Sequence, residues 1–277
     1  MVQIITDSSS LYTPEAARKA GFESVPLCVS IGDRHGRDLE IDMDDYYKKI
    51  SQGLLPTTSQ PPLGDVLEAF HTYEGSEIIN ISMADGLSGT YQTACSAREM
   101  LEHKDQITVF NSRTLCGPHR YMVQTAQKMK EEGSSAQEIL AWLKQAADNT
   151  ESFLIPQDFS FLKRGGRLTP LAAATGSVLK LKPIMKLTPD GKRLDKFGIK
   201  RTMASAAESI IQYMKEKHLG RQHLLYISHA EALEDAGKIK AMFENAFSEL
   251  EVRILELSAA FVAQGGPRCV AIQYIRR

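Results

Sequence analysis

Strand and helix follow one another most clearly in the stretch EIINISMADGLSGTY, residues 77–91. Its apolar start predicts a buried strand over Glu77–Met83. The small and polar residues of Ala84–Thr90 predict a turn that leads into a helix ending near Leu101. A strand that leads directly into a helix is the repeating unit of α/β folds.

The same alternation extends from this stretch toward both ends of the chain. Val2–Asp7 is a short apolar run that predicts the first strand, and Thr13, Pro14 and Gly21 supply the cap, the first-turn proline and the terminal glycine of a helix. Alternating strands and helices predict a mainly parallel sheet covered by helices on both faces. The other predicted elements here are strands over Phe22–Ile31 and Gln106–Asn111, helices over Met43–Gln52 (capped by Asp42) and Leu63–Tyr73, a loop over Leu54–Pro62, and two helices around Glu131-Glu132-Gly133, the second opened by a Ser134–Gln137 capping box.

The pattern changes near Asn149, so we expect two α/β domains, residues 1–149 and 150–277. The turn signal Thr188-Pro189-Asp190-Gly191 lies between two apolar runs and predicts a β-hairpin. The first domain should hold a mainly parallel sheet flanked by helices, and the second a mixed sheet with a hairpin. The elements predicted in the second domain are strands over Lys182–Leu187, Arg193–Ile199, Leu224–Ile227, Val252–Leu257 and Cys269–Ile275, and helices starting at Thr169-Pro170 and spanning Leu233–Phe247.

Composition and charge exclude several classes of protein. The 277 residues include 33 Lys and Arg against 34 Asp and Glu, a formal net charge of -1, so no charge surplus draws the chain to nucleic acid. No run of about 18 apolar residues occurs, so we expect no transmembrane segment, and Met1–Asp7 does not resemble a signal peptide. The 4 cysteines lie far apart without a C-x-x-C pair, which favours a reducing cytosol and a cytoplasmic protein.

Two junctions rich in small hydroxyl residues form the candidate functional site. They are Thr57-Thr58-Ser59-Gln60-Pro61, ahead of a predicted helix, and Leu87-Ser88-Gly89-Thr90-Tyr91, after a predicted strand. In parallel α/β folds such junctions lie at the carboxyl ends of strands, where helix N-termini and hydroxyls donate to anionic ligands. Gly89 would let a ligand head approach the backbone. A purely structural role of these hydroxyls as helix caps stays open.

The segment Gly86–Thr90 also resembles the G-x-S-x-G nucleophile elbow of hydrolases, with Ser88 in the nucleophile position. Thr90 stands where that motif has its second glycine. A serine esterase would also need an acid and a late histidine, for which Asp195 and His229 are the candidates. A sugar- or glycerone-phosphate enzyme, with phosphate bound at the same junctions, is a third hypothesis.

Motifs for metals and nucleotides are missing from the sequence. The seven histidines show no H-x-x-x-H or H-E-x-x-H spacing, and the chain has neither a Walker A loop nor a G-x-G-x-x-G motif. Asp7 ends the first predicted strand, where magnesium or phosphate sites often have a carboxylate, but the expected role of Asp7 is to cap a loop. The sequence therefore predicts no cofactor and no bound metal.

Six stretches of the chain follow one another in the order found in a known family. They are Ile5–Ser9, Pro56–Pro61, Leu87–Gln92, Leu162–Arg167, Leu181–Ile184 and Gly266-Pro267. Taken together, they resemble the DegV family of bacterial fatty-acid-binding proteins, almost from end to end of the chain. The resemblance implies two α/β domains with a fatty acid between them. It also implies that the bound acyl chain is presented to a separate fatty acid kinase, which makes the acyl phosphate, so the chain itself is not the catalyst.

The resemblance also implies which residues bind the ligand. The first domain would hold the head group, while the second would hold the acyl-chain tunnel and the kinase-docking surface. By similarity, the carboxylate ligands are Thr58 and Ser88, with help from Thr57, Ser59 and Gly89.

Two further positions follow from the family pattern. Family members often carry H-x-G-P-G near the C-terminus, where this chain has Gln264–Arg268, so Gln264 replaces a charged histidine with a neutral donor. By resemblance, Arg167 and Arg201 are expected to contact the kinase. From its residues alone, the basic run Lys163–Arg167 has three open interpretations: a solvated loop, an anion clamp or a docking patch for an acidic partner.

A fatty acid needs an apolar tunnel and a satisfied carboxylate. Burial contributes about 0.8 kcal/mol per methylene, whereas a buried carboxylate without donors is strongly destabilised. The small-residue helix expected over 171–179, with Gly176, would leave room for an acyl tail. Close packing of that helix on the sheet is the alternative.

Overall fold

The computed structural model describes residues 1–174 and 181–277, and the chain divides into two units, Met1–Asp148 and Asn149–Arg277. This division falls one residue before the boundary expected from the sequence. Each unit has its own sheet and its own buried apolar cluster. None of the helices in the described ranges has the length and apolar character needed to cross a bilayer.

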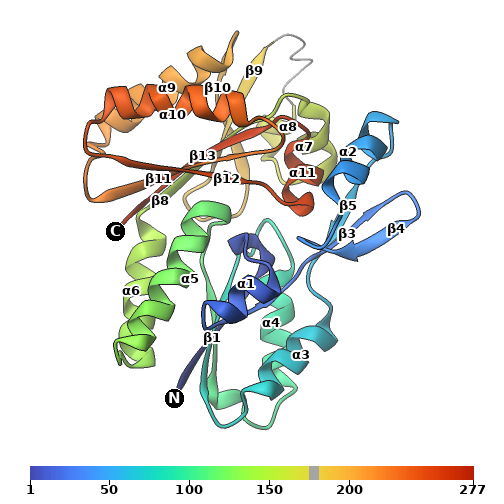
Figure 1. Ribbon diagram of the computed structural model, residues 1–277, viewed down its shortest axis with the longest axis vertical. Helices are drawn as coiled ribbons and strands as arrows, with labels where there is room; N and C mark the ends of the chain where they lie inside the picture. Colours follow the sequence, from blue (N-terminus) through green and yellow to red (C-terminus); the bar gives the residue numbers. More distant parts are fainter. Residues whose placement is uncertain (175–180) are drawn as a thin grey trace. The chain divides into compact units, whose positions relative to one another are not determined.

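The first unit is built on a four-stranded sheet in the order β2-β1-β6-β7, in which every neighbouring pair is parallel. Helices α3 and α4 pack together on one side of these strands, and α5 and α6 on the other (Figure 1). The mainly parallel, helix-flanked sheet is confirmed. Apart from a second, smaller sheet, the elements of the first unit are β1 (Val2–Asp7), α1 (Pro14–Lys19), β2 (Glu23–Val25), α2 (Met43–Ser51), α3 (Leu63–Thr72), β6 (Glu77–Ser82), α4 (Thr90–Glu99), β7 (Ile107–Asn111), α5 (Cys116–Glu131) and α6 (Ala136–Asp148), with 3-10 turns η1 (Ser8–Ser10) and η2 (Lys104–Gln106).

Strand β6 is buried on both faces because helices cover both sides of its sheet. Ile78, Ile79 and Ile81 have no exposed surface. Val66 and Phe70 of α3 pack into the same cluster as Ile78. This continuous apolar run is typical of a central parallel strand.

The single strand expected over Phe22–Ile31 is wrong. It forms two strands, β2 and β3 (Cys28–Ile31), which belong to different sheets. Pro26 lies between them and has no N–H for a ladder, so the strand cannot continue through it. Strand β3 pairs antiparallel with β4 (Arg34–Arg37) and β5 (Thr57–Ser59) in a separate three-stranded sheet, so the stretch expected to be a loop contains β5.

The capping box of α6 is shifted by one residue from its expected position. Ser135 and Glu138 form it, instead of Ser134 and Gln137. The Ser135 N–H donates to Glu138 Oε2 at 2.8 Å, and the Glu138 N–H donates to Ser135 Oγ at 3.3 Å. Both pairs have the required spacing, but the glutamate carries the negative charge that a helix N-terminus favours.

The second unit contains a mixed six-stranded sheet in the order β10-β9-β8-β13-β11-β12. β9 and β10 form the expected antiparallel hairpin, and β11 and β12 are the parallel pair. Helices α7, α9 and α11 are not among the elements expected from the sequence. The elements are β8 (Thr150–Ile155), α7 (Phe159–Gly165), α8 (Pro170–Ala173), β9 (Lys182–Leu187), β10 (Leu194–Lys200), α9 (Met203–Glu216), β11 (His223–His229), α10 (Leu233–Ala246), β12 (Glu251–Glu256), α11 (Ala259–Gly265) and β13 (Val270–Arg276).

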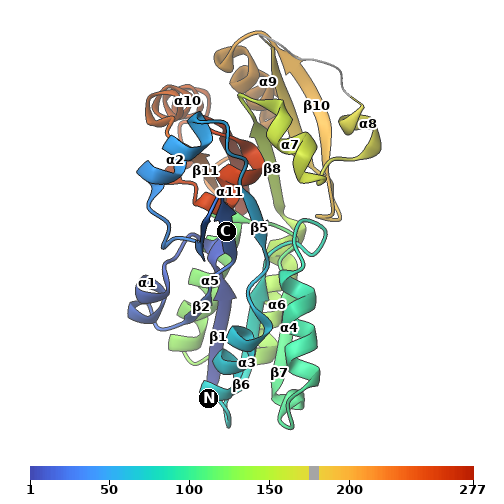
Figure 2. The same ribbon diagram turned by 90° about the vertical axis from the view of Figure 1, so that its right-hand side faces the viewer.

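Alternate residues of β8 face different helices. Phe153 and Ile155 belong to the cluster that α9 and α10 complete, whereas Leu154 packs with Phe159 and Ala172 of α7 and α8. Because strand side chains alternate between faces, this sheet is covered on both sides. Figure 2 shows α8 and α9 on opposite sides of β10.

Candidate ligand-binding site

The hydroxyl residues of β5 lie on two faces of a small sheet. Thr58 pairs with Val29, and its neighbours Thr57 and Ser59 pair with Ser30 and Cys28. Side chains alternate along a strand, so Thr58 faces the side opposite to Thr57 and Ser59. Thr58 is half-buried and the other two are exposed. The expected junction at the end of a parallel strand is therefore wrong for this segment, and its three hydroxyls cannot all face one ligand.

Ser59 has a partner on its own face of the sheet. Burial raises the pKa of the Cys28 thiol, and a hydrogen bond with the Ser59 side chain acts in the opposite direction. This cross-strand contact gives Ser59 a structural role in holding β5 to β3.

Ser88 lies where the sequence predicts it, in the loop between β6 and α4. Its Oγ is 2.8 Å from Thr90 Oγ1 and accepts from the Thr90 backbone N–H at 3.3 Å. Gly89 is the N-cap of α4 and provides no side-chain cap. Ser88 is half-buried, whereas Thr90 is 4% exposed. The helix start therefore presents the Ser88 hydroxyl with a buried hydroxyl behind it.

The two hydroxyl segments meet through Gln60 and Gly89. A Cβ placed on Gly89 would lie 3.0 Å from Gln60 Oε1 and 3.2 Å from its Cδ, so the absence of a side chain lets the Gln60 amide rest close to the backbone. Gln60 directly follows β5. Gln60 belongs to the hydroxyl-rich segment Thr57–Pro61, but it was not among the predicted site residues. Its position directly after three hydroxyl residues is the sequence signal that could have identified it.

Beneath this loop, Asp7 ties two strand ends together. Its Oδ1 accepts from the Ser9 N–H and its Oδ2 from the Met83 N–H, both at 2.9 Å. The carboxylate is 2% exposed. The expected loop cap is confirmed, and it fixes the start of the segment that carries Ser88.

A buried histidine forms hydrogen bonds at the same carboxyl edge of the parallel sheet. His119 has no exposed surface, and its Nε2 and Nδ1 lie 2.8 Å from Thr6 Oγ1 and 3.0 Å from Ser112 Oγ. Burial lowers the pKa of His119, with Asp7 acting in the opposite direction. The ring is therefore a neutral hydrogen-bonding link between β1 and the chain after β7.

In the second unit, Gln264 lies in α11 against the end of α7. A Cβ on Gly165 would collide with Gln264 Oε1, and a Cβ on Gly266 would lie 3.1 Å from the Phe161 ring. Gly165 and Gly266, which have no side chains, therefore permit close packing of α7 and α11.

The basic run belongs to the end of α7 and is not an independent turn. Lys163 and Arg164 occupy its last turn, where positive charge suits the helix dipole. Arg167 is half-buried and donates to the Gly165 carbonyl, and burial followed by the nearby Arg193 lowers its pKa. Arg201, just after β10, is exposed.

Among the described residues, no hydrogen bonds link Ser88, His229 and Asp195 into the catalytic triad of an esterase. Ser88 bonds only to Thr90 within the described ranges. His229 Nδ1, which would have to donate to a triad acid, instead accepts from the Ala232 N–H at 3.3 Å. Asp195 accepts from Thr169 Oγ1 at 2.7 Å.

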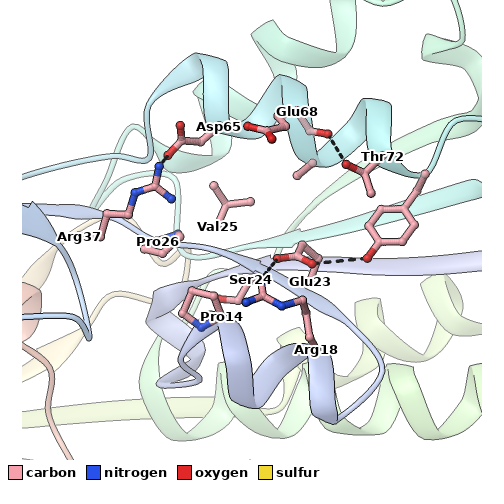
Figure 3. A pocket seen from close by; sticks show the side chains of 12 residues that line it. Pro14, Arg18, Glu23, Ser24, Val25, Pro26, Arg37, Asp65, Glu68 and Thr72 are labelled. Atoms are coloured by element: carbon pink, nitrogen blue, oxygen red, sulfur yellow. Dashed lines mark hydrogen bonds and ion pairs between the residues drawn. The ribbon is translucent and has the colours of Figure 1, made fainter.

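A polar pocket of about 270 Å³ opens between α1, β2 and α3 (Figure 3). Two ion pairs line it, Arg18–Glu23 at 3.3 Å and Arg37–Asp65 at 2.7 Å. Charged walls do not suit an acyl tail. The small-residue helix over 171–179 was expected to form a wall of the acyl-chain tunnel. Gly176 of this segment lies outside the described residues. In the described part of the segment, Ala172 is buried and Leu171 is exposed.

Fold and site together define a two-unit α/β protein with a neutral hydroxyl loop at the carboxyl edge of a parallel sheet. The chain belongs to the DegV family, because the model of that family, described as an uncharacterised protein family, matches residues 1–277. Over 258 residues it is 31% identical to a DegV domain-containing protein of Halalkalibacterium halodurans, covering 91% of this chain and 90% of that one.

Two solved structures share the fold across the whole chain. A DegV family protein from Thermus thermophilus, described by its fatty acid binding, has a TM-score of 0.89 and 26% identity and covers 100% of this chain and 99% of its own. DegV of Bacillus subtilis, described as a fatty acid binding protein, has a TM-score of 0.85, 26% identity and the same coverage. These likenesses confirm the α/β fold expected from the sequence.

Proposed function

We propose that this protein binds a long-chain fatty acid and holds its carboxylate at the carboxyl edge of the parallel sheet. The observation that carries the proposal is the Ser88 hydroxyl, backed by Thr90 and set beside Gly89 and Gln60. The fatty acid binding described for the Thermus thermophilus and Bacillus subtilis proteins supports it.

The ligand's two ends require different surroundings. A tail of about sixteen carbons gains on the order of 10 kcal/mol on burial, before ordering costs. The carboxylate needs donors wherever water is excluded. Ser88 and Thr58 are neutral donors, so they can hold a carboxylate without fixing it in a buried ion pair.

Among the hydroxyls of β5, Thr58 is the proposed donor. It is half-buried on the face away from Thr57 and Ser59, and Ser59 is engaged with Cys28. Gln264, which stands where the family often has a histidine, is proposed as an uncharged donor to the bound fatty acid.

We also propose that the chain is a carrier of the fatty acid and not a catalyst. It would present its acyl chain to a separate fatty acid kinase, which forms the acyl phosphate, with Arg201 and Arg167 on the docking surface and without a cofactor. Arg201 is exposed, as such a contact requires. We further propose a cytoplasmic location, because all four cysteines are free thiols.

Solvent extraction of the purified chain followed by mass spectrometry tests the proposal. We expect stoichiometric fatty acid, and after lipid removal, saturable binding of a sixteen-carbon fatty acid by calorimetry. Ser88→Ala should weaken binding roughly 10- to 150-fold, because a hydrogen bond to a charged group contributes about 1.5–3 kcal/mol.

Thr58→Val should lower the affinity as well, while Thr108→Val, an exposed threonine of β7, serves as the matched control. An empty extract together with no binding of added fatty acid would refute the carrier function. Unchanged affinity in both Ser88→Ala and Thr58→Val would refute the head-group site alone.

A further inference from the structure

Three potential metal ligands gather at the amino edge of the parallel sheet, opposite the edge that carries Ser88. His71 and Glu74 lie at the end of α3 just before β6, and His103 lies just before η2 and β7. Because β6 and β7 are parallel neighbours, the segments that precede them meet at the same edge. In Figure 1 this edge is at the bottom of the first unit, beside the N-terminus.

The ligand atoms of the three side chains lie within 4.8 Å of one another. His71 Nδ1 is 4.0 Å from Glu74 Oε2, and His103 Nδ1 is 3.8 Å from Glu74 Oε1. Around a tetrahedral Zn²⁺, with bonds of about 2.0–2.2 Å, neighbouring ligand atoms are about 3.3–3.6 Å apart. Small side-chain rotations, without backbone movement, would close this difference.

His103 is the least explained member of the cluster. Its side chain is only 8% exposed, and its Nε2 is buried without a hydrogen-bond partner among the described residues. Its Nδ1 is too far from Glu74 for a hydrogen bond. An ion between the two residues would give Nδ1, the nitrogen that faces Glu74, a partner, while Nε2 would stay buried on the other side of the ring.

The neighbouring cations pair with a carboxylate other than Glu74. Lys104, next to His103, is paired with Glu99 at 2.9 Å, and Arg98 is paired with the same carboxylate. Neither of these cations forms an ion pair with Glu74 in the described part of the chain. His71 and Glu74 are exposed, so an ion can enter from solvent and keep a water molecule as its fourth ligand.

We propose that His71, Glu74 and His103 bind one Zn²⁺ ion. Two imidazoles and one carboxylate with an open fourth position are a known zinc donor set. The metal would join the end of α3 to the segment between α4 and β7. The spacing of histidines in the sequence does not reveal this site, because His103 follows a whole further helix and strand.

The test titrates metal-free, full-length protein with ZnCl₂ by calorimetry and repeats it with Co²⁺ followed by visible absorption. We expect one Zn²⁺ per chain, a rise in Tm on binding, and the absorption of four-coordinate Co²⁺. His71→Asn and Glu74→Gln, both at exposed positions, should each lower the affinity at least tenfold. His218→Asn, an exposed histidine of the second unit, should bind like the unmodified protein.

Two results would overturn the site. One is the absence of stoichiometric Zn²⁺ binding, which would leave three neighbouring polar side chains without a metal. The other is Zn²⁺ binding that His71→Asn and Glu74→Gln do not weaken, which would assign the metal to other groups such as the free cysteines. His103→Asn adds a third measurement, and its circular dichroism shows whether loss of binding comes with loss of fold.

Discussion

The Ser88 and Thr90 hydroxyl oxygens lie 2.8 Å apart, and the Thr90 backbone N–H donates to the same Ser88 oxygen at 3.3 Å. When the buried Thr90 hydroxyl donates, the Ser88 oxygen accepts two hydrogen bonds. Its own proton is then free to donate to a ligand. Thr90 therefore acts as a positioning residue for Ser88, and an anionic ligand strengthens this polarity because each bond of such a chain polarises the next.

Replacing Thr90 with valine removes the hydroxyl while keeping the shape of the side chain. We expect fatty acid affinity to fall about fivefold, corresponding to about 1 kcal/mol for one neutral hydrogen bond. Calorimetry with a sixteen-carbon fatty acid measures it, and Thr108→Val is the control. The double variant Ser88→Ala/Thr90→Val should bind no more weakly than Ser88→Ala, since Thr90 acts through Ser88. Additive losses would show that Thr90 contributes by another route.

Gly266 and Gly237 should respond to the same substitution with opposite signs. Gly266 has a φ of +79°, and a Cβ there would lie 3.1 Å from the Phe161 ring, so Gly266→Ala should destabilise the protein by about 1–3 kcal/mol. Gly237 lies within α10 with nothing within 4 Å of its Cβ position, so Gly237→Ala should stabilise by up to about 1 kcal/mol. Urea unfolding measures both. Equal effects would mean that the α7–α11 contact does not require glycine.

The elements that the sequence predicts well are those with a local signal. The hairpin around Asp190-Gly191 and the apolar strand β6 have patterns that depend on neighbouring residues only. Strand β5 does not: it has three polar residues, and only its pairing with β3 makes it a strand. Pro26 was the missed local signal for the end of β2.

The same distinction applies to the site. The position of Ser88 follows from the strand-to-helix order and was predicted, whereas the face of Thr58 depends on the register of β5 against β3. The contact between Gln60 and Gly89 joins two separate segments. Pairings of this kind depend on tertiary packing, which residue types and spacing do not encode locally.

The buried neutral His119 should make stability depend on pH. Burial lowers its pKa in the folded protein, whereas the unfolded chain binds a proton near pH 6.5. As the pH falls below about 6.5, the unfolded state takes up a proton that the folded state excludes, so the free energy of unfolding decreases, by at most about 1.4 kcal/mol per pH unit. Urea unfolding from pH 8 to pH 5, followed by Trp142 fluorescence, measures this slope.

His119→Gln should flatten that slope, whatever its effect on stability at pH 8. His218→Asn, at an exposed position, should leave the slope unchanged. Trp142 is suited to the measurement because it is the only tryptophan and lies in α6 of the same unit as His119. An unaltered slope in His119→Gln would show that the loss of stability at low pH does not come from His119.

Arg201 is the better position for a test of the proposed kinase docking, because it is exposed while Arg167 is half-buried and bonded to the Gly165 carbonyl. Arg201→Glu should leave fatty acid affinity unchanged and lower acyl phosphate formation with a fatty acid kinase roughly tenfold at low salt, since a charge at the edge of an interface mainly affects association. Arg221→Glu, an exposed arginine of the same unit, is the matched control. If both variants support the same rate as the unmodified protein, the docking surface lies elsewhere.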